Sequence, residues 1–192
     1  MKKSVKVMAM AFATALIASS GSALEVSGVK FDDKVDVAGV RLVLNGARLR
    51  TKVMLKIYVV GLYVPAPTTS ADAVINSSQP RRVRLVLKRN LGAGTIWDAF
   101  DEGIQANSSP AELAALKPKL DQIEKQFEEI GDVAEGDAID IDFTADGATI
   151  VHYKGQPKGS IPGTDLQRAL LKIWLGAKPV QEDVKEALLK GA

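Results

Sequence analysis

The chain has 192 residues, a net charge of +2, one histidine and no cysteine. Without cysteine it cannot form disulfides, thiol nucleophiles or thiolate metal sites, and one histidine excludes any site built from several imidazoles. We therefore expect no metal and no other cofactor. The length suits one domain, and no repeat or low-complexity linker suggests a boundary.

The first 23 residues have the pattern of a secretory signal peptide. Three lysines precede an uncharged stretch, 7–18, which is too short to span a bilayer comfortably. Small residues follow, and we expect cleavage after Ala23, with an uncleaved N-terminal anchor as the alternative. The remaining domain, 24–192, is then expected in the periplasm or outside the cell, without a membrane span.

The expected leader also accounts for the positive charge of the whole chain. Its removal takes away three lysines and no acids, so that the net charge changes from +2 to −1. A near-neutral domain without a basic stripe and interleaved aromatics does not favour nucleic acid as a partner.

The first half of the expected domain is rich in strand patterns. Residues 26–44 read as short strands, and Asn45-Gly46 is the strongest hairpin signal in the chain because both residues tolerate positive φ. The apolar run 53–64 predicts a central strand covered on both faces. A short helix is expected over 70–75. In 81–88, apolar residues alternate with basic ones, which predicts a strand with one solvated face.

Helices dominate the next segment. Trp97, Phe100 and Ile104 share one helical face, and a second helix is expected to start at Ser109, which is followed by proline and by a glutamate three positions later. Apolar residues recur at spacings of three and four up to Ile130. Pro118 interrupts them, which predicts a kink or two separate helices.

A second hairpin is expected around a turn at Asp146-Gly147. Asp140 and Asp142 alternate with apolar residues and fail the calcium-loop spacing, so they are assigned to the exposed face of a strand. His152 is expected to be structural or at the surface. Helices over 163–175 and 181–189 complete an α+β domain with a mostly antiparallel sheet and helices on one face.

Basic side chains next to the apolar strand give the main binding hypothesis. A cation at the mouth of an apolar cleft suits a fatty carboxylate, because the guanidinium of Arg50 can bind the head group and Tyr58 can add a donor. The two residues are eight apart and share a face if the strand is continuous, which a turn near Thr51 would prevent. The alternative is that the basic residues are surface cations of an edge strand, with Tyr58 used in packing.

Three segments together resemble the bacterial exported branch of the chalcone isomerase-like family. They are LVLNGARLRTKVMLKIYVVGLYVPAP, RRVRLVLKRNL and GSIPGTDLQRALLKIWLGAKPVQEDVKEALL. The resemblance covers about 26–190. It implies a curved antiparallel sheet, a helical layer on one face and a ligand cleft between them.

The resemblance also bears on catalysis. Plant chalcone isomerases use polar residues at positions that correspond here to Tyr58, to Ile96 or Trp97, to Gly103 or Ile104, and to Ile173. Most of these residues are apolar, so no catalytic residue is assigned. An isomerase or intramolecular lyase acting on another substrate remains the alternative, and an envelope scaffold without a small ligand is a third hypothesis.

Fatty-acid-binding members of the family keep an arginine and a tyrosine that hold a carboxylate. The resemblance implies this role for Arg50 and Tyr58, with Arg48 as an auxiliary cation. The sequence thus predicts an exported, non-catalytic protein that binds a fatty acid or a similar amphipathic carboxylate in a cleft between sheet and helices.

Overall fold

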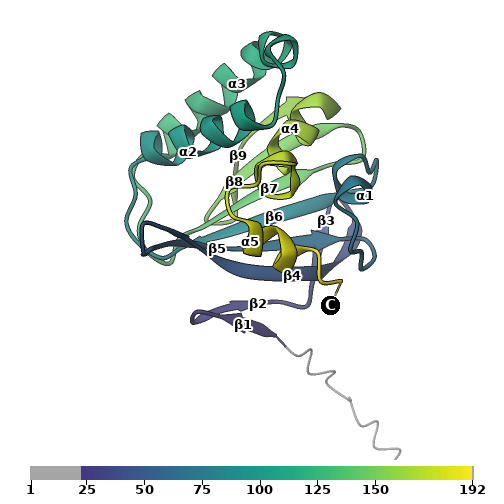
Figure 1. The fold of residues 1–192 in the computed structure, drawn as a ribbon, viewed down its shortest axis with the longest axis vertical. Coiled ribbons are helices and arrows are strands. Elements are labelled where there is room, and N and C mark those ends of the chain that lie inside the picture. Colours follow the sequence, from purple (N-terminus) through teal and green to yellow (C-terminus); the bar gives the residue numbers. More distant parts are fainter. Residues whose placement is uncertain (1–22, 192) are drawn as a thin grey trace, which may run out of the picture.

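The computed structural model describes residues 23–191, so the predicted leader, 1–23, lies outside the described residues except for Ala23. Its main element is an antiparallel sheet of seven strands in sequence order, with helices packed on one face (Figure 1). This arrangement confirms the prediction of an α+β fold with a curved, mostly antiparallel sheet. No helix of the described part is long and apolar enough to cross a membrane.

The sheet is a simple meander. Its strands are β3 (Lys34–Val37), β4 (Val40–Lys52), β5 (Leu55–Val64), β6 (Arg81–Leu87), β7 (Ala138–Phe143), β8 (Ala148–Tyr153) and β9 (Gln156–Pro162). A separate hairpin of β1 (Leu24–Val26) and β2 (Val29–Phe31) precedes it. Strand β9 was not predicted from the sequence. The turn before it, Lys154-Gly155, has the positive φ angles of a hairpin turn.

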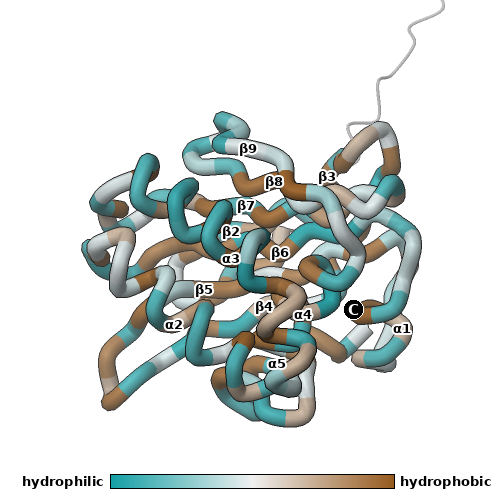
Figure 2. The backbone as a smooth tube through the Cα atoms, turned by 90° about the horizontal axis from the view of Figure 1, so that it is seen from above, coloured by the Kyte–Doolittle hydropathy of each residue, from teal (hydrophilic) through white to brown (hydrophobic). Residues whose placement is uncertain are grey.

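The helices are inserted between strands or follow the last strand. They are α1 (Ala71–Ile75), α2 (Ala93–Ala106), α3 (Pro110–Ile130), α4 (Thr164–Leu175) and α5 (Glu182–Leu188). Helix α3 begins with the predicted capping box between Ser109 and Glu112. In Figure 2, hydrophilic residues mark the outer turns of α2 and α3, and hydrophobic residues follow the middle strands.

Two hydrophobic cores lie on opposite faces of the sheet. The larger core packs the sheet against the helices, and Trp174 of α4 is its largest fully buried side chain. The smaller core lies on the back face, where Phe31 of the β1–β2 hairpin packs with Val59 and Tyr63 of β5. Gly61 makes this possible, since a Cβ there would come within 2.5 Å of the Phe31 ring. Strand β5 is therefore covered on both faces, as predicted.

The prediction of a turn at Asn45-Gly46 is wrong. Both residues lie inside β4 at a register shift against β5, and Asn45 is fully buried. The Asn45 amide donates to the carbonyl oxygens of Thr68 and Leu188 and accepts from the Thr68 amide. A Cβ on Gly46 would lie 2.0 Å from the Ala187 oxygen. The pair therefore serves to dock α5 against the strand.

The hairpin turn lies instead at Val53 and Met54, which have φ angles of 49° and 63°. The central strand accordingly begins at Leu55 and not at Val53. Apolar residues are unusual in such a turn, which favours asparagine and glycine, so the sequence rules pointed to the wrong dipeptide.

Two further expectations were wrong: the alternative of two separate helices at Pro118, and the exposed position of Asp140 and Asp142. Helix α3 continues through Pro118, which is exposed on its outer side, while Leu116 and Leu120 are buried. The helix is thus held by packing on either side of the proline. Asp140 and Asp142 are only 5% exposed, because both pair with arginines of the neighbouring strand.

Candidate functional site

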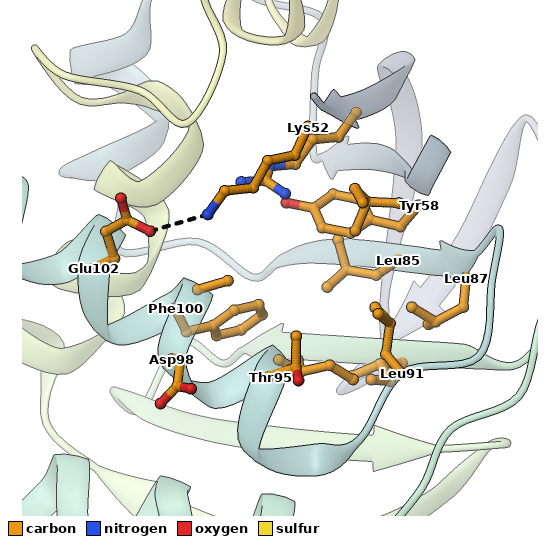
Figure 3. Close-up of a pocket in the computed structure, with 14 residues that line it drawn as sticks. Lys52, Tyr58, Leu85, Leu87, Leu91, Thr95, Asp98, Phe100 and Glu102 are labelled. Atoms are coloured by element: carbon orange, nitrogen blue, oxygen red, sulfur yellow. Dashed lines mark ion pairs between the residues drawn. The ribbon is translucent and has the colours of Figure 1, made fainter. Parts of the chain in front are cut away.

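A cavity of about 270 Å³ lies between the helix-side face of the sheet and α2 (Figure 3). Its sheet wall includes Tyr58, Leu85 and Leu87, and its helix wall includes Ile96 and Phe100. The walls are mostly apolar, and the volume is near the lower end of the range for small-ligand sites. This is the cleft between sheet and helices that the sequence predicted.

Arg50 lies at the polar end of this cavity. Its side chain is only 7% exposed and its guanidinium carbon lies 5.5 Å from the centre of the Tyr58 ring. Its Nε is buried without a hydrogen-bond partner, and the side chain makes no ion pair within residues 23–191. An unpaired buried guanidinium is costly, and an anion in the cavity would remove that cost.

Arg81 shows how the same fold treats a buried arginine that serves structure. It is 1% exposed and donates to the backbone oxygens of Val74 and Ser77 and to Oε1 of Gln167. Arg50 has none of these acceptors. Arg81 also has an unpartnered Nε, but Arg50 makes no side-chain hydrogen bond within the described residues, which makes it the buried arginine with the most unused hydrogen-bonding capacity.

Tyr58 is held beside Arg50 by its strand and by α4. The two residues are direct cross-strand partners, so they share a face even though the chain turns between them. The Tyr58 hydroxyl accepts a hydrogen bond of 3.0 Å from Trp174 Nε1. Since the indole only donates, the phenol proton remains available to an acceptor in the cavity.

Burial keeps this phenol protonated. It raises the pKa of Tyr58 above its ordinary value, and this effect outweighs the opposing influences of Arg50 and the Trp174 hydrogen bond. The cavity thus offers a permanent cation and a neutral hydroxyl donor at one end. Together they fit the two oxygens of a carboxylate.

The rim of the cavity is polar and solvent-exposed. Lys52, at the end of β4, lies 3.5 Å from Glu102 of α2, and Figure 3 draws the end of the Lys52 side chain between Glu102 and Tyr58. Thr95 and Asp98 complete the exposed part of the rim. Both acids that line the cavity, Asp98 and Glu102, are exposed, and neither forms an ion pair with Arg50.

The structure does not bring Arg48 into the cavity. It points to the same side of the sheet as Arg50 but lies two residues earlier in β4, where α5 covers the strand. Its guanidinium donates to Asp183 Oδ2 at 2.9 and 3.1 Å, and the pair is exposed. Arg48 thus connects β4 with α5.

The positions that correspond to catalytic residues in plant chalcone isomerases lie in hydrophobic packing. Ile96 lines the cavity, whereas Ile104 and Ile173 are buried in the large core. A Cβ on Gly103 would lie 2.9 Å from Ile173, so this region is closely packed. At these positions, only Tyr58 supplies a polar group to the cavity.

A second group of charged side chains lies on the back face of the sheet. Arg82 binds both oxygens of Asp142 at 2.5 and 2.7 Å, and Arg84 binds both oxygens of Asp140 at 2.7 and 2.9 Å. His152 lies 3.1 Å from Asp142. Within the described part of the chain, no group of acids and histidine could hold a metal ion.

The sequence of this chain matches known families and proteins. A family described as chalcone isomerase-like matches residues 23–190. Fatty-acid-binding protein 2 of Arabidopsis thaliana is 30% identical over an alignment of 112 residues that covers 55% of this chain and 27% of that protein. The matched segment thus spans about a quarter of that relative.

The fold has a close counterpart among crystal structures. A fatty-acid binding protein of Arabidopsis thaliana has a TM-score of 0.71 to this chain, covering 88% of this chain and 96% of that one at 17% identity. At this identity the likeness concerns the fold alone. Since the family match extends over almost all of the described residues, the chain belongs to the chalcone isomerase-like family.

Proposed function

We propose that this chain binds a fatty acid or a similar amphipathic carboxylate in the cavity between the sheet and α2. Arg50 binds the carboxylate, Tyr58 donates a hydrogen bond to it, and the apolar walls surround the hydrocarbon chain. Arg48 is left out of the ligand contacts because it pairs with Asp183.

The main support for this proposal is that Arg50 is buried without a hydrogen-bond acceptor or a countercharge within residues 23–191. Its side chain lies at one end of an apolar cavity. A carboxylate would supply two charge-assisted hydrogen bonds at low dielectric, where such bonds are strong. Two plant proteins similar to this chain, one in sequence and one in fold, are named fatty-acid-binding proteins, which supports the same ligand class.

We also propose that the protein acts in a bacterial cell envelope after export. The support is the sequence of residues 1–23, with its lysines, uncharged stretch and small residues before Ala23. Mass determination of the protein from a periplasmic fraction tests this part. An N-terminus at Leu24 is expected, and an intact leader would contradict it.

An isomerase or intramolecular lyase is the competing function. Such a reaction needs a group that moves a proton at the substrate, and Arg50 and Tyr58 are the polar groups inside this cavity. A guanidinium has donors and no acceptor, and burial raises the pKa of Tyr58, so neither side chain is a ready base. These features favour binding over turnover.

Native mass spectrometry of protein purified from its bacterial host tests the proposal. The wild type is expected to carry a fatty acid, and Arg50→Met is expected to reduce the bound fraction at least about tenfold through loss of the charge-assisted hydrogen bonds. Arg48→Met is the matched control, since it removes an arginine of the same strand outside the cavity. Equal ligand content in Arg50→Met and wild type would refute the proposal.

A further inference from the structure

The tip of the β4–β5 hairpin exposes three consecutive apolar residues. Val53, Met54 and Leu55, here called the apolar tip, are 87%, 98% and 52% exposed, and the only other large hydrophobic residue exposed within 23–191 is Leu24. The tip is the hydrophobic corner at the lower left of Figure 2. Single exposed hydrophobics are common, but a continuous group at a turn indicates an interaction site.

The backbone of the tip does not explain its sequence. Val53 and Met54 both have positive φ, a conformation that favours asparagine and glycine and is unfavourable for a β-branched side chain. Neither side chain gains packing, because both are almost fully exposed. Asparagine and glycine at these two positions would make the fold more stable.

Lysines flank the apolar tip. Lys52 precedes it and Lys56 follows it, and both are exposed. Lys56 makes no ion pair within the described residues, and Lys52 makes one exposed pair with Glu102, which is weak at such positions. The other acid at this rim, Asp98, lies on α2 and forms no ion pair in the described part.

An apolar group between lysines matches the surface of an anionic bilayer. Apolar side chains enter the boundary between head groups and acyl chains, while lysines remain among the phosphates. Each lysine near an anionic surface adds attraction that salt weakens.

The apolar tip is continuous with the cavity. Lys52 and Ile57, on the two strands that carry the tip, also line the cavity, and Arg50 and Tyr58 follow immediately along the same strands. A bilayer in contact with the tip would therefore lie next to the cavity mouth.

We infer that the apolar tip inserts into the surface of an anionic lipid bilayer and places the cavity mouth there. The bilayer is then the source or destination of the ligand, a role that rests on the proposed function. The docking itself depends on the tip and its lysines and not on Arg50.

The double variant Val53→Asn, Met54→Gly tests the inference. It gives the turn its preferred residues, so its melting temperature is expected to be equal to or higher than that of the wild type. Its partition onto vesicles of equal parts phosphatidylcholine and phosphatidylglycerol, measured by flotation, is expected to fall about tenfold. Both proteins are purified as their host processes them, and mass determination confirms identical N-termini.

Charge variants provide the matched control. Lys56→Gln is expected to weaken binding to the anionic vesicles but not to vesicles of phosphatidylcholine alone, whereas Lys125→Gln, on the exposed side of α3, should change neither. Raised salt should reduce binding of the wild type and remove the difference between these two variants.

Bound fatty acid, measured in the same samples, separates this inference from the proposed function. Arg50→Met protein that floats like the wild type but carries no fatty acid supports the docking and the cavity together. Wild-type flotation without any bound fatty acid would leave the docking standing and refute the ligand. The inference is overturned if the double variant floats like the wild type, or if the tip joins two copies of the chain in solution.

Discussion

The arginines on the back face of the sheet and the arginine in the cavity differ in their partners. On the back face, Arg82 and Arg84 each bind both oxygens of an aspartate on the next strand. Their side chains are 13% and 23% exposed, whereas Arg50, in the cavity on the helix side, is more deeply buried and has no acceptor within the described residues. The charges of the back-face arginines are therefore balanced within the chain, whereas the charge of Arg50 would be balanced only by an anion from outside the chain.

The largest expected effect on stability comes from breaking an arginine–aspartate pair on the back face. Arg84→Met leaves Asp140, whose side chain is 7% exposed, without two hydrogen bonds and without its nearest countercharge, so that only Arg82, at 3.9 Å, remains opposite it. We expect the free energy of unfolding to fall by about 3 kcal/mol, the usual cost of breaking a buried pair from one side. Urea denaturation at neutral pH measures it.

The control is the corresponding change on the other face. Arg50→Met removes an unpaired charge and should not lower the free energy of unfolding of ligand-free protein. Adding Asp140→Leu to Arg84→Met should restore most of the stability. Equal losses for Arg84→Met and Arg50→Met would contradict the distinction between the two faces.

A smaller expected effect is the loss of stability at alkaline pH caused by Tyr63, which is buried on the back face. Burial raises the pKa of Tyr63 to about 12, above the ordinary value of about 10. Its contribution to stability is therefore complete below about pH 10 and is lost as the pH rises toward 12, because the unfolded chain releases this proton first. Tyr63→Phe should lessen the alkaline loss by about 2 kcal/mol.

Urea denaturation of Tyr63→Phe and wild type between pH 9 and pH 12 measures this difference. At neutral pH the variant should be at least as stable, since the Tyr63 hydroxyl is buried without a hydrogen-bond partner. Parallel pH profiles for the two proteins would show that Tyr63 does not titrate as its burial requires.

Local patterns predicted most elements of the fold. The alternation in β6 and β7, the capping box at Ser109 and the periodicity of α4 are signals within a few residues of one another. The wrong turn prediction at Asn45-Gly46 reflects a distant contact. Asn45 is held by Leu188, 143 positions away, and this contact overrides a local turn preference.

The candidate site was predictable in part. Arg50 and Tyr58 could be chosen from their types and position, but their pairing follows from the hairpin register and not from their spacing. Arg48 could not be separated from Arg50 without knowing that α5 brings Asp183 to it. The pairing of Asp140 and Asp142 in β7 could have been predicted, because arginines alternate with the same period of two in β6.

Calorimetric titration with a fatty acid and with its methyl ester tests most directly whether Arg50 binds a carboxylate. Both ligands offer the same hydrocarbon chain, but only the acid offers a charged head group. We expect the wild type to bind the acid at least about tenfold more tightly than the ester, and Arg50→Met to bind both alike. Equal affinity of the wild type for acid and ester would contradict the account.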